Sequence, residues 1–265
     1  MGEQPNILYT QEEDGVATIT LNRPEKLNAF THAMIDDWGR YIADAGNDPA
    51  VKVVLLAGSG RAFCVGADAD EMDSRGKQDE LARKNFLWQH VHKIALTMER
   101  MDKPVIAAVN GLARGAGADM ALMCDIRIAG ESTSFAWSYV NLNVIAGDGG
   151  TYYLPKIIGM PRALELFWTG RTVTAVEADR IGLVNRVVPD ADLSAVSRTL
   201  AKQIAAQPKD SIQFYRRAAY QGETQTLYSH LDMISSHMAV LRGTPENHAR
   251  IAAFREQRRK GKVQK

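Results

Sequence analysis

Two spacings of hydrophobic positions run along the chain, and each predicts a different kind of element. Residues 7–10 and 16–21 alternate around an Asp14-Gly15 pair, a pattern typical of a β-hairpin. Nearly continuous apolar runs rich in β-branched residues predict buried strands. These runs cover residues 51–57, 104–109, 125–129 and 184–188.

Stretches in which apolar residues recur every three or four positions predict helices. Up to residue 190 they fall at 33–45, 78–101 and 116–123, with two short helices in 149–168 that are separated at Gly159 and Pro161. Beyond residue 190 strand signals stop, and helices fit 191–206, 210–221, 224–242 and 245–260. We therefore expect an α/β domain with largely parallel strands in residues 1–190 and a helical region in residues 191–265.

Composition and charge exclude several classes of protein. The 265 residues include 32 basic and 31 acidic side chains, whereas nucleic-acid-binding domains usually carry a clustered basic excess. The basic cluster at 255–265 is interpreted as a solvated helix end. Apolar runs stay shorter than the roughly 18 residues that a membrane span needs, and residues 1–10 lack the pattern of a signal peptide. Cys64 and Cys124 form no close pair, so we expect no zinc or redox motif and a reducing, cytoplasmic location.

Common catalytic motifs are absent from the sequence. It has no Gly-x-Ser-x-Gly elbow, no Gly-Lys-Ser/Thr phosphate loop and no His-Glu-x-x-His. The segment Gly115-Ala-Gly117 follows a predicted strand and opens a helix, but it lacks the third glycine and the acidic partner of a dinucleotide-binding loop. A Rossmann-type site is therefore not favoured.

Two junctions between a strand and a helix are rich in Gly and Ala. They span 59–68 and 110–119. Small residues let a ligand approach the backbone, and free N–H groups at a helix start favour negative charge. If the two loops face one point, they can hold one oxygen from two sides, as in an oxyanion hole. The same composition also fits two turns that are tight for steric reasons, and the residues alone leave both interpretations open.

Several motifs in order resemble those of the crotonase (enoyl-CoA hydratase/isomerase) superfamily. Ala62-Phe-Cys-Val-Gly-Ala-Asp68 is similar to its first oxyanion loop, and Pro104-Val-Ile-Ala-Ala-Val-Asn-Gly111 leads into its second. Leu21-Asn-Arg-Pro24 with Leu27-Asn-Ala29 resembles its coenzyme A loop, and Gly147-Asp-Gly-Gly-Thr151 continues the match. The resemblance extends over nearly the whole chain.

This resemblance implies a spiral of ββα repeats followed by C-terminal helices that build trimers, commonly paired into hexamers. It implies an acyl-CoA substrate whose thioester enolate is held by the N–H groups of Ala67 and Ala116. Coenzyme A arrives as part of the substrate, with no permanently bound cofactor and no metal. The implied coenzyme A contacts are Lys26, Leu27, Ala29, Asp68, Ala69 and Phe254. Lys26 fits an ordinary surface lysine equally well.

The implied acid/base positions depart from the two glutamates of typical hydratases. The first position holds Asp119 and the second holds Tyr139. A tyrosine, with an ordinary pKa of about 10, is a poor base near neutral pH, so hydration by two carboxylates is not expected. We expect Asp119 to move the proton, with or without Asp148, which lies in a loop that borders the reacting carbons in the family. The other interpretation of Asp148 is an N-cap of the following helix.

Aromatic residues and a histidine are concentrated in the segments that the resemblance places around the acyl group. We expect Trp88, His92, Trp137 and Tyr152 to form the acyl pocket, which favours a bulky or ring-bearing acyl group. His92 also matches a pocket histidine of an aryl-CoA dehalogenase branch, but the aspartate of that branch falls at Gly147. Two further alternatives stay open: a C–C hydrolase acting on β-diketones, and a catalytically silent acyl-CoA-binding homologue.

Overall fold

The computed structural model describes residues 5–76 and 79–263, and the chain divides into two compact units, Met1–Ala205 and Ala206–Lys265. The first unit contains every strand of two sheets. The larger sheet has six strands in the order β1-β2-β3-β5-β7-β10. Their bounds are β1 Ile7–Gln11, β2 Val16–Leu21, β3 Val53–Gly58, β5 Val105–Val109, β7 Ile126–Gly130 and β10 Arg186–Val188.

The predicted hairpin and parallel strands are confirmed. β1 and β2 pair antiparallel across Asp14-Gly15, whereas the pairs from β2 to β10 along the sheet are all parallel. Gly15 has φ +83°, a left-handed conformation that glycine adopts without strain. The sequence predicted this sheet because each of its strands is a clear apolar run or alternation.

A second sheet of four short strands escaped prediction. Its order is β4-β6-β8-β9, with bounds Ala62–Cys64, Leu112–Arg114, Ser134–Ala136 and Thr172–Thr174. Three residues are too few to show a period, which explains the omission. β4, β6 and β8 pair parallel, and each follows a strand of the larger sheet. The repeated passage from large sheet to small sheet to helix is the ββα spiral expected for the family fold.

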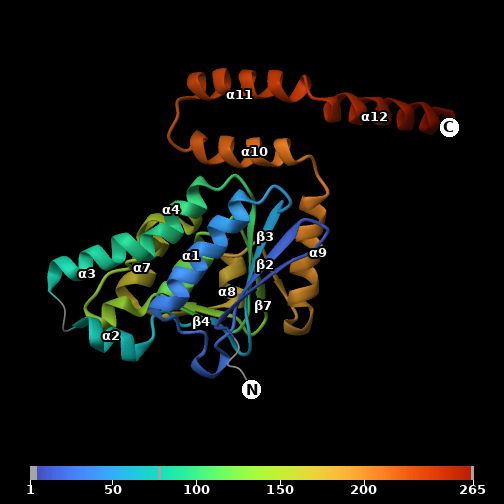
Figure 1. Cartoon of the computed structure of the whole chain (residues 1–265). Helices are drawn as coiled ribbons and strands as arrows, with labels where there is room; N and C mark the ends of the chain where they lie inside the picture. The colour runs from blue at the N-terminus through green and yellow to red at the C-terminus, as the bar shows by residue number, and fades with distance from the viewer. Residues whose placement is uncertain (1–4, 77–78, 264–265) are drawn as a thin grey trace. The chain divides into compact units, whose positions relative to one another are not determined.

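Helices cover both faces of the six-stranded sheet in the first unit (Figure 1). Val54 and Leu56 point into a core shared with α1 (His32–Asn47) and α4 (His92–Arg100). Val53 and Leu55 point to the opposite face, where α9 (Leu193–Ala205) covers them. This alternation follows from the two-residue period of a strand, and it explains why buried strands read as continuous apolar runs.

The remaining helices of the first unit are short, and one differs from its prediction. They are η1 Pro24–Lys26, α2 Ala69–Gly76, α3 Glu80–Phe86, η2 Leu87–Val91, α5 Ala116–Leu122, η3 Ser138–Leu142, α6 Gly150–Ile158, α7 Met160–Thr169, α8 Ala175–Arg180 and η4 Asp190–Asp192. The single helix predicted over 78–101 is interrupted by the π-helical turn η2, and its expected start at Gln78 lies outside the described residues.

The first unit extends to Ala205, beyond the boundary expected at residue 190. The reason is α9, whose buried Leu193, Ala201 and Ala205 belong to the core of the sheet. The second unit consists of α10 Lys209–Gly222, α11 Leu227–Arg242 and α12 Pro245–Val263. None of the helices within residues 5–76 and 79–263 has the length and apolar character of a membrane span.

Candidate functional site

The two Gly/Ala-rich junctions meet in the structure. β4 and β6 lie side by side, so the loops that follow them leave the sheet together. A Cβ on Gly117 would lie 2.2 Å from the carbonyl oxygen of Cys64, and one on Gly66 would lie 3.5 Å from the nitrogen of Ala116. The glycines therefore permit the two backbones to touch, and the two loops converge, as both interpretations of their composition allow.

The backbone of the first loop turns the N–H of Ala67 toward one side. Phe30 donates its N–H to Gly66 O at 2.9 Å, and Asp68 donates its N–H to Phe30 O at 3.0 Å. In such a bridge the intervening residue directs its own N–H to the opposite side, so Ala67 N–H points away from Phe30. In the second loop Gly115 has φ +49° and precedes Ala116, the first residue of α5.

Both loops open onto one cavity of about 460 Å³. Gly66, Ala67, Gly115 and Ala116 form one part of its wall. The opposite walls are mostly apolar side chains: Phe30, Val65, Met72, Phe86, Leu87, Val91, Leu142, Val144 and Ile145. Polar lining comes from Arg83, Arg114, Ser138, Tyr139 and Asp148. The cavity thus combines an apolar interior with two backbone N–H groups and one carboxylate.

The three predicted acid/base residues are close together but not equivalent. Tyr139 and Asp148 line the cavity, whereas Asp119 is fully buried behind them and is not part of the lining. The Tyr139 hydroxyl lies within hydrogen-bond distance of both carboxyl groups, 2.7 Å from Asp119 Oδ2 and 3.3 Å from Asp148 Oδ2. Trp137 Nε1 donates to Asp119 Oδ1 at 2.8 Å. A direct contact between Asp119 and a substrate is therefore not supported by this geometry.

Burial changes the acid/base properties of this group. It raises the pKa of Asp119 to about 7, with the neighbouring charge of Asp148 adding to the effect and hydrogen bonds from Tyr139, Trp137 and the Gly150 N–H opposing it. Burial also raises the pKa of Tyr139, and the charges of Asp119 and Asp148 raise it further. Tyr139 is thus a neutral hydrogen-bonding group near neutral pH.

Asp148 is not the N-cap of the helix that follows it. The residue before α6 is Gly149, in a left-handed conformation with φ +102°, and no side chain makes a capping bond there. The N-cap position thus falls at Gly149, one residue later than the cap interpretation placed it, and Asp148 lines the cavity. The preceding residue is held in place by His92, whose Nε2 lies 2.8 Å from the carbonyl oxygen of Gly147.

The predicted aromatic pocket is not where the sequence suggested. Trp88 and Tyr152 are 64% and 54% exposed, and Trp137 is completely buried beneath the site. Neither these three nor His92 belongs to the cavity lining. The π-helical turn explains Trp88, since it presents Leu87 and Val91 to the cavity instead. The apolar residues Leu142, Val144 and Ile145 were the sequence signal for the missing wall.

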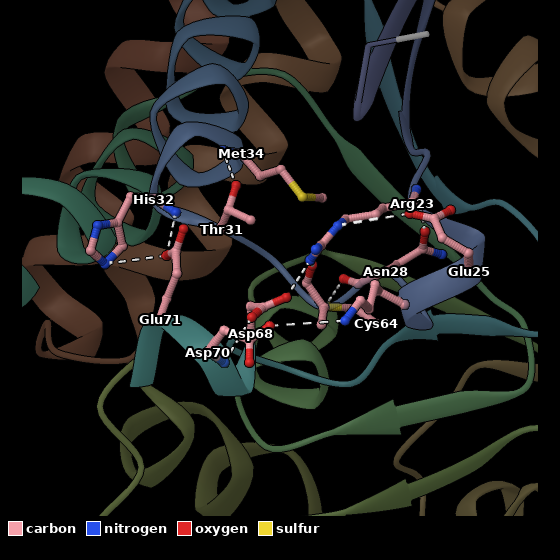
Figure 2. Close-up of polar contacts among 12 residues, drawn as sticks. Arg23, Glu25, Asn28, Thr31, His32, Met34, Cys64, Asp68, Asp70 and Glu71 are labelled. Carbon is pink, nitrogen blue, oxygen red and sulfur yellow. Dashed lines mark hydrogen bonds and ion pairs between the residues drawn. The ribbon is translucent and has the colours of Figure 1, made fainter. Parts of the chain in front are cut away.

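The expected coenzyme A loop is held by a buried polar network (Figure 2). Asn28 is fully buried, donates to the carbonyl oxygens of Ser59 and Ala62 at 2.9 and 2.8 Å, and accepts from the Arg23 N–H at 2.8 Å. Arg23 Nη1 bonds Ala29 O at 3.0 Å and Asp68 Oδ2 at 2.5 Å. Leu27 and Asn28 both have positive φ, 54° and 56°. This network ties the loop to the first junction.

The individual residues expected to contact coenzyme A differ in exposure. Lys26 is half-exposed, with Nζ 3.9 Å from Asp70 Oδ2, and Ala69 is exposed. Ala29 and Asp68 are buried, and Asp68 accepts from Arg23, which holds its pKa below the usual range. The Asp68 side chain therefore holds the loop in place through its ion pair with Arg23. Phe254 lies in α12 of the second unit and is 59% exposed.

A metal site has no donor set in the part of the chain that the structure describes. There, His, Cys, Asp and Glu side chains form no group of three or more that could hold an ion. Cys64 and Cys124 are both buried, and neither forms a disulfide.

Comparisons with known proteins point to one family. A family model described as enoyl-CoA hydratase/isomerase matches residues 11–261. The chain is 33% identical to a 1,2-epoxyphenylacetyl-CoA isomerase of Escherichia coli, over 93% of this chain and 94% of that protein. It is 33% identical to a short-chain-enoyl-CoA hydratase of Clostridium acetobutylicum, over 96% of each chain. An enoyl-CoA hydratase from Bacillus anthracis has a similar structure, with a TM-score of 0.89, 32% identity and coverage of 96% and 97%.

Proposed function

This chain belongs to the enoyl-CoA hydratase/isomerase family, and from that premise we propose that it moves a double bond along an acyl-CoA thioester by proton transfer through Asp148. The observation that carries this proposal is the cavity lining, in which Asp148 is the one carboxylate among the described residues. Hydration requires one group to activate water and another to protonate carbon. A double-bond shift requires one carboxylate that removes a proton and returns it to a different carbon.

The thioester oxygen takes up the negative charge during this step. Asp148 removes a proton from Cα, the C–H electron pair passes into the enolate, and the N–H groups of Ala67 and Ala116 stabilise the oxyanion. The protonated Asp148 then returns the proton to Cγ, and the electron pair of the new C–H bond comes from the dienolate. Support comes from the convergence of Gly66-Ala67 and Gly115-Ala116 on the cavity that Asp148 lines.

The apolar wall indicates the kind of acyl group. The apolar surface comes from Met72, Phe86, Leu87, Leu142, Val144 and Ile145. An unsubstituted hydrocarbon acyl chain buries well against such a surface. Coenzyme A is proposed to lie along Lys26, Leu27, Ala29, Ala69 and the backbone at Asp68, and Phe254 of a neighbouring copy of the chain is proposed to contact it as well.

Location and assembly are further proposals from the family. Two buried thiols that form no disulfide agree with a reducing, cytoplasmic location. We propose a homotrimer or a dimer of trimers, supported by apolar residues that stay exposed on the helices of the second unit.

Mass spectrometry of the products tests the reaction. Incubated with 2-enoyl- and 3-enoyl-CoA thioesters of several chain lengths, the enzyme is expected to interconvert isomers of equal mass rather than to add water. Asp148→Asn is expected to lower kcat/KM by about a hundredfold or more, the usual effect of removing a general acid/base. Asp179→Asn, which removes an exposed carboxyl group of α8, serves as the control.

The other outcomes identify the alternatives. Products heavier by one water indicate a hydratase, and full activity of Asp148→Asn refutes the role of Asp148. Binding of acyl-CoA without turnover indicates a silent homologue, and failure to bind coenzyme A favours the β-diketone hydrolase.

A further inference from the structure

One phenolic hydroxyl bridges the two carboxyl groups of the site. Tyr139 Oη lies 2.7 Å from Asp119 Oδ2 and 3.3 Å from Asp148 Oδ2. A phenol has one proton to donate and an oxygen that can also accept. The Tyr139 hydroxyl can therefore hydrogen-bond both carboxyl groups only if one of them is protonated. It then donates to the ionised carboxylate and accepts from the protonated carboxylic acid.

The two carboxyl groups have different surroundings. Asp119 is fully buried, and its Oδ1 accepts from Trp137 Nε1 at 2.8 Å. The Gly150 N–H bonds the same carboxyl group. Asp148 is 7% exposed and lines the cavity. The group with access to substrate and the group sealed from it are thus joined through Tyr139.

Two carboxylates this close do not both ionise readily, so the pair retains one proton over a wide pH range. Burial disfavours charge most strongly on the group that solvent cannot reach, which places this proton on Asp119. The raised pKa of Asp119, about 7, agrees with this assignment.

We propose that Asp119 is a positioning residue that carries the proton of the pair and, through the Tyr139 hydroxyl, orients Asp148 as an ionised base. Asp119 donates to Tyr139 Oη, and Tyr139 donates to Asp148 Oδ2. The proposal rests on the function proposed above, in which Asp148 exchanges the proton with substrate. In this proposal Asp119, which stands at the first acid/base position of the family, acts through hydrogen bonds and does not contact the substrate.

The other titratable groups facing the pair leave this arrangement unchanged. Burial raises the pKa of Cys64 on β4 to about 12, with the charge of Asp148 contributing, so the thiol stays protonated. Burial likewise raises the pKa of Tyr139 on η3. His92 of α4 bonds the Gly147 carbonyl oxygen, not a carboxyl group of the pair.

Asparagine at position 119 tests the assignment, because its amide reproduces a protonated aspartic acid. The Nδ2 group can donate to Tyr139, and Oδ1 can accept from Trp137 and Gly150. Asp119→Asn is expected to keep kcat/KM well above that of Asp148→Asn, whose loss should reach the roughly hundred- to ten-thousandfold range of a missing general base. Asp119→Leu, which has no polar group, is expected to lose more activity than Asp119→Asn.

Tyr139→Phe tests the bridge. Removing the hydroxyl deprives the Asp148 carboxylate of a donor, and a lost hydrogen bond to the charged form raises a pKa. We expect kcat to fall with little change in KM, and the acid limb of the kcat/KM profile to move to higher pH. A purely structural effect of the substitution would leave that limb in place.

Infrared difference spectroscopy across pH 7 tests the location of the proton without substrate. The C=O stretch of a buried carboxylic acid is expected on the acid side of pH 7 in the wild type and is expected to be absent in Asp119→Asn. In Asp148→Asn the band should still be present in acid. As the pH is raised it should be lost at a lower pH than in the wild type, because the neighbouring charge that raises the pKa of Asp119 is gone.

Two results would overturn the proposal: a loss of activity in Asp119→Asn as large as in Asp148→Asn, in a variant that still unfolds cooperatively, or a carboxylic acid band that Asp119→Asn leaves intact. Failure of the proposed function is a separate result. An inactive wild type, or an active Asp148→Asn, refutes proton transfer by Asp148, while the infrared bands still locate the proton.

Discussion

Asp119 sits in an environment that favours its neutral form. Its carboxyl group is completely buried, and its named hydrogen-bond partners are the neutral groups Trp137, Tyr139 and the Gly150 N–H. Burial of an ionised carboxylate costs free energy unless charge or hydrogen bonds compensate. The pKa of about 7, against an ordinary value of 3.8, shows that compensation is incomplete.

This raised pKa predicts that Asp119 makes the fold less stable as pH rises. Between about pH 4 and pH 7 the folded state binds more protons than the unfolded state, so stability is greatest below this window and falls through it. Three pKa units correspond to about 4 kcal/mol. Asparagine at position 119 cannot ionise. The unfolding free energy of Asp119→Asn minus that of the wild type should therefore increase by up to about 4 kcal/mol between pH 4 and pH 8.

Urea unfolding at a series of pH values measures this difference. A constant difference in unfolding free energy between Asp119→Asn and the wild type across the window would show that folding does not raise the pKa of Asp119.

At the scale of single residues, sequence motifs located the acid/base positions but not their exposure. Asp119, Tyr139 and Asp148 were identified from matched motifs, and the structure brings all three together. That Asp119 is sealed from the cavity depends on Trp137 and Gly150, which are distant in sequence and touch it only after folding. The exposure of Trp88 likewise depends on a π-helical turn that side-chain periodicity does not reveal.

At the scale of elements, the close approach of α5 to β4 determines the shape of the site. A Cβ on Gly117 would lie 2.2 Å from Cys64 O, so Gly117→Ala must push α5 away from the strand. We expect a loss of roughly 1–3 kcal/mol in stability from overpacking, together with a larger loss of activity because Ala116 moves relative to Ala67.

Gly39→Ala in α1 is a matched control for this prediction. Its Cβ would lie 3.8 Å from Ile94 Cγ1, which is an ordinary van der Waals contact. Alanine in a helix interior is favoured over glycine by about 1 kcal/mol. Thermal unfolding and kcat/KM of both variants provide the measurement; wild-type activity in Gly117→Ala would show that the approach of α5 to β4 is not required.

Elements that lie within an apolar run or a periodic stretch were predicted, whereas α2, α8 and the strands of the second sheet, which lie outside such patterns, were not. The strands of the six-stranded sheet and the helices α1, α6, α7 and α9 to α12 lie close to their predicted positions. The three-residue strands of the second sheet have no detectable period, yet β4 and β6 position both junctions of the site. Their pairing is fixed by the spiral, which is a property of chain topology and not of local sequence.

At the scale of the whole molecule, the two compact units differ in what they bury. The first unit holds both hydrophobic cores, which extend from Ile7 to Ala205. In the second unit α11 has no buried residue although it carries several large apolar side chains. Those exposed to solvent are Leu227, Tyr228, Leu231, Met238 and Val240. Exposed apolar surface concentrated on one helix is typical of a protein–protein interface.

The covering partner that we propose for α11 is another copy of this chain, in line with the expected trimer. Light scattering coupled to gel filtration should give a mass that is a multiple of the 29.2 kDa chain. Leu231→Glu places a charge in the apolar set and is expected to lower the assembly mass, because an interface that buries an unpaired charge is strongly disfavoured. Val176→Glu changes an equally apolar exposed residue of α8 in the first unit and is expected to leave the mass unchanged. A monomeric wild type, or an assembly that survives Leu231→Glu but not Val176→Glu, would exclude α11 as the contact and leave its apolar side chains without this explanation.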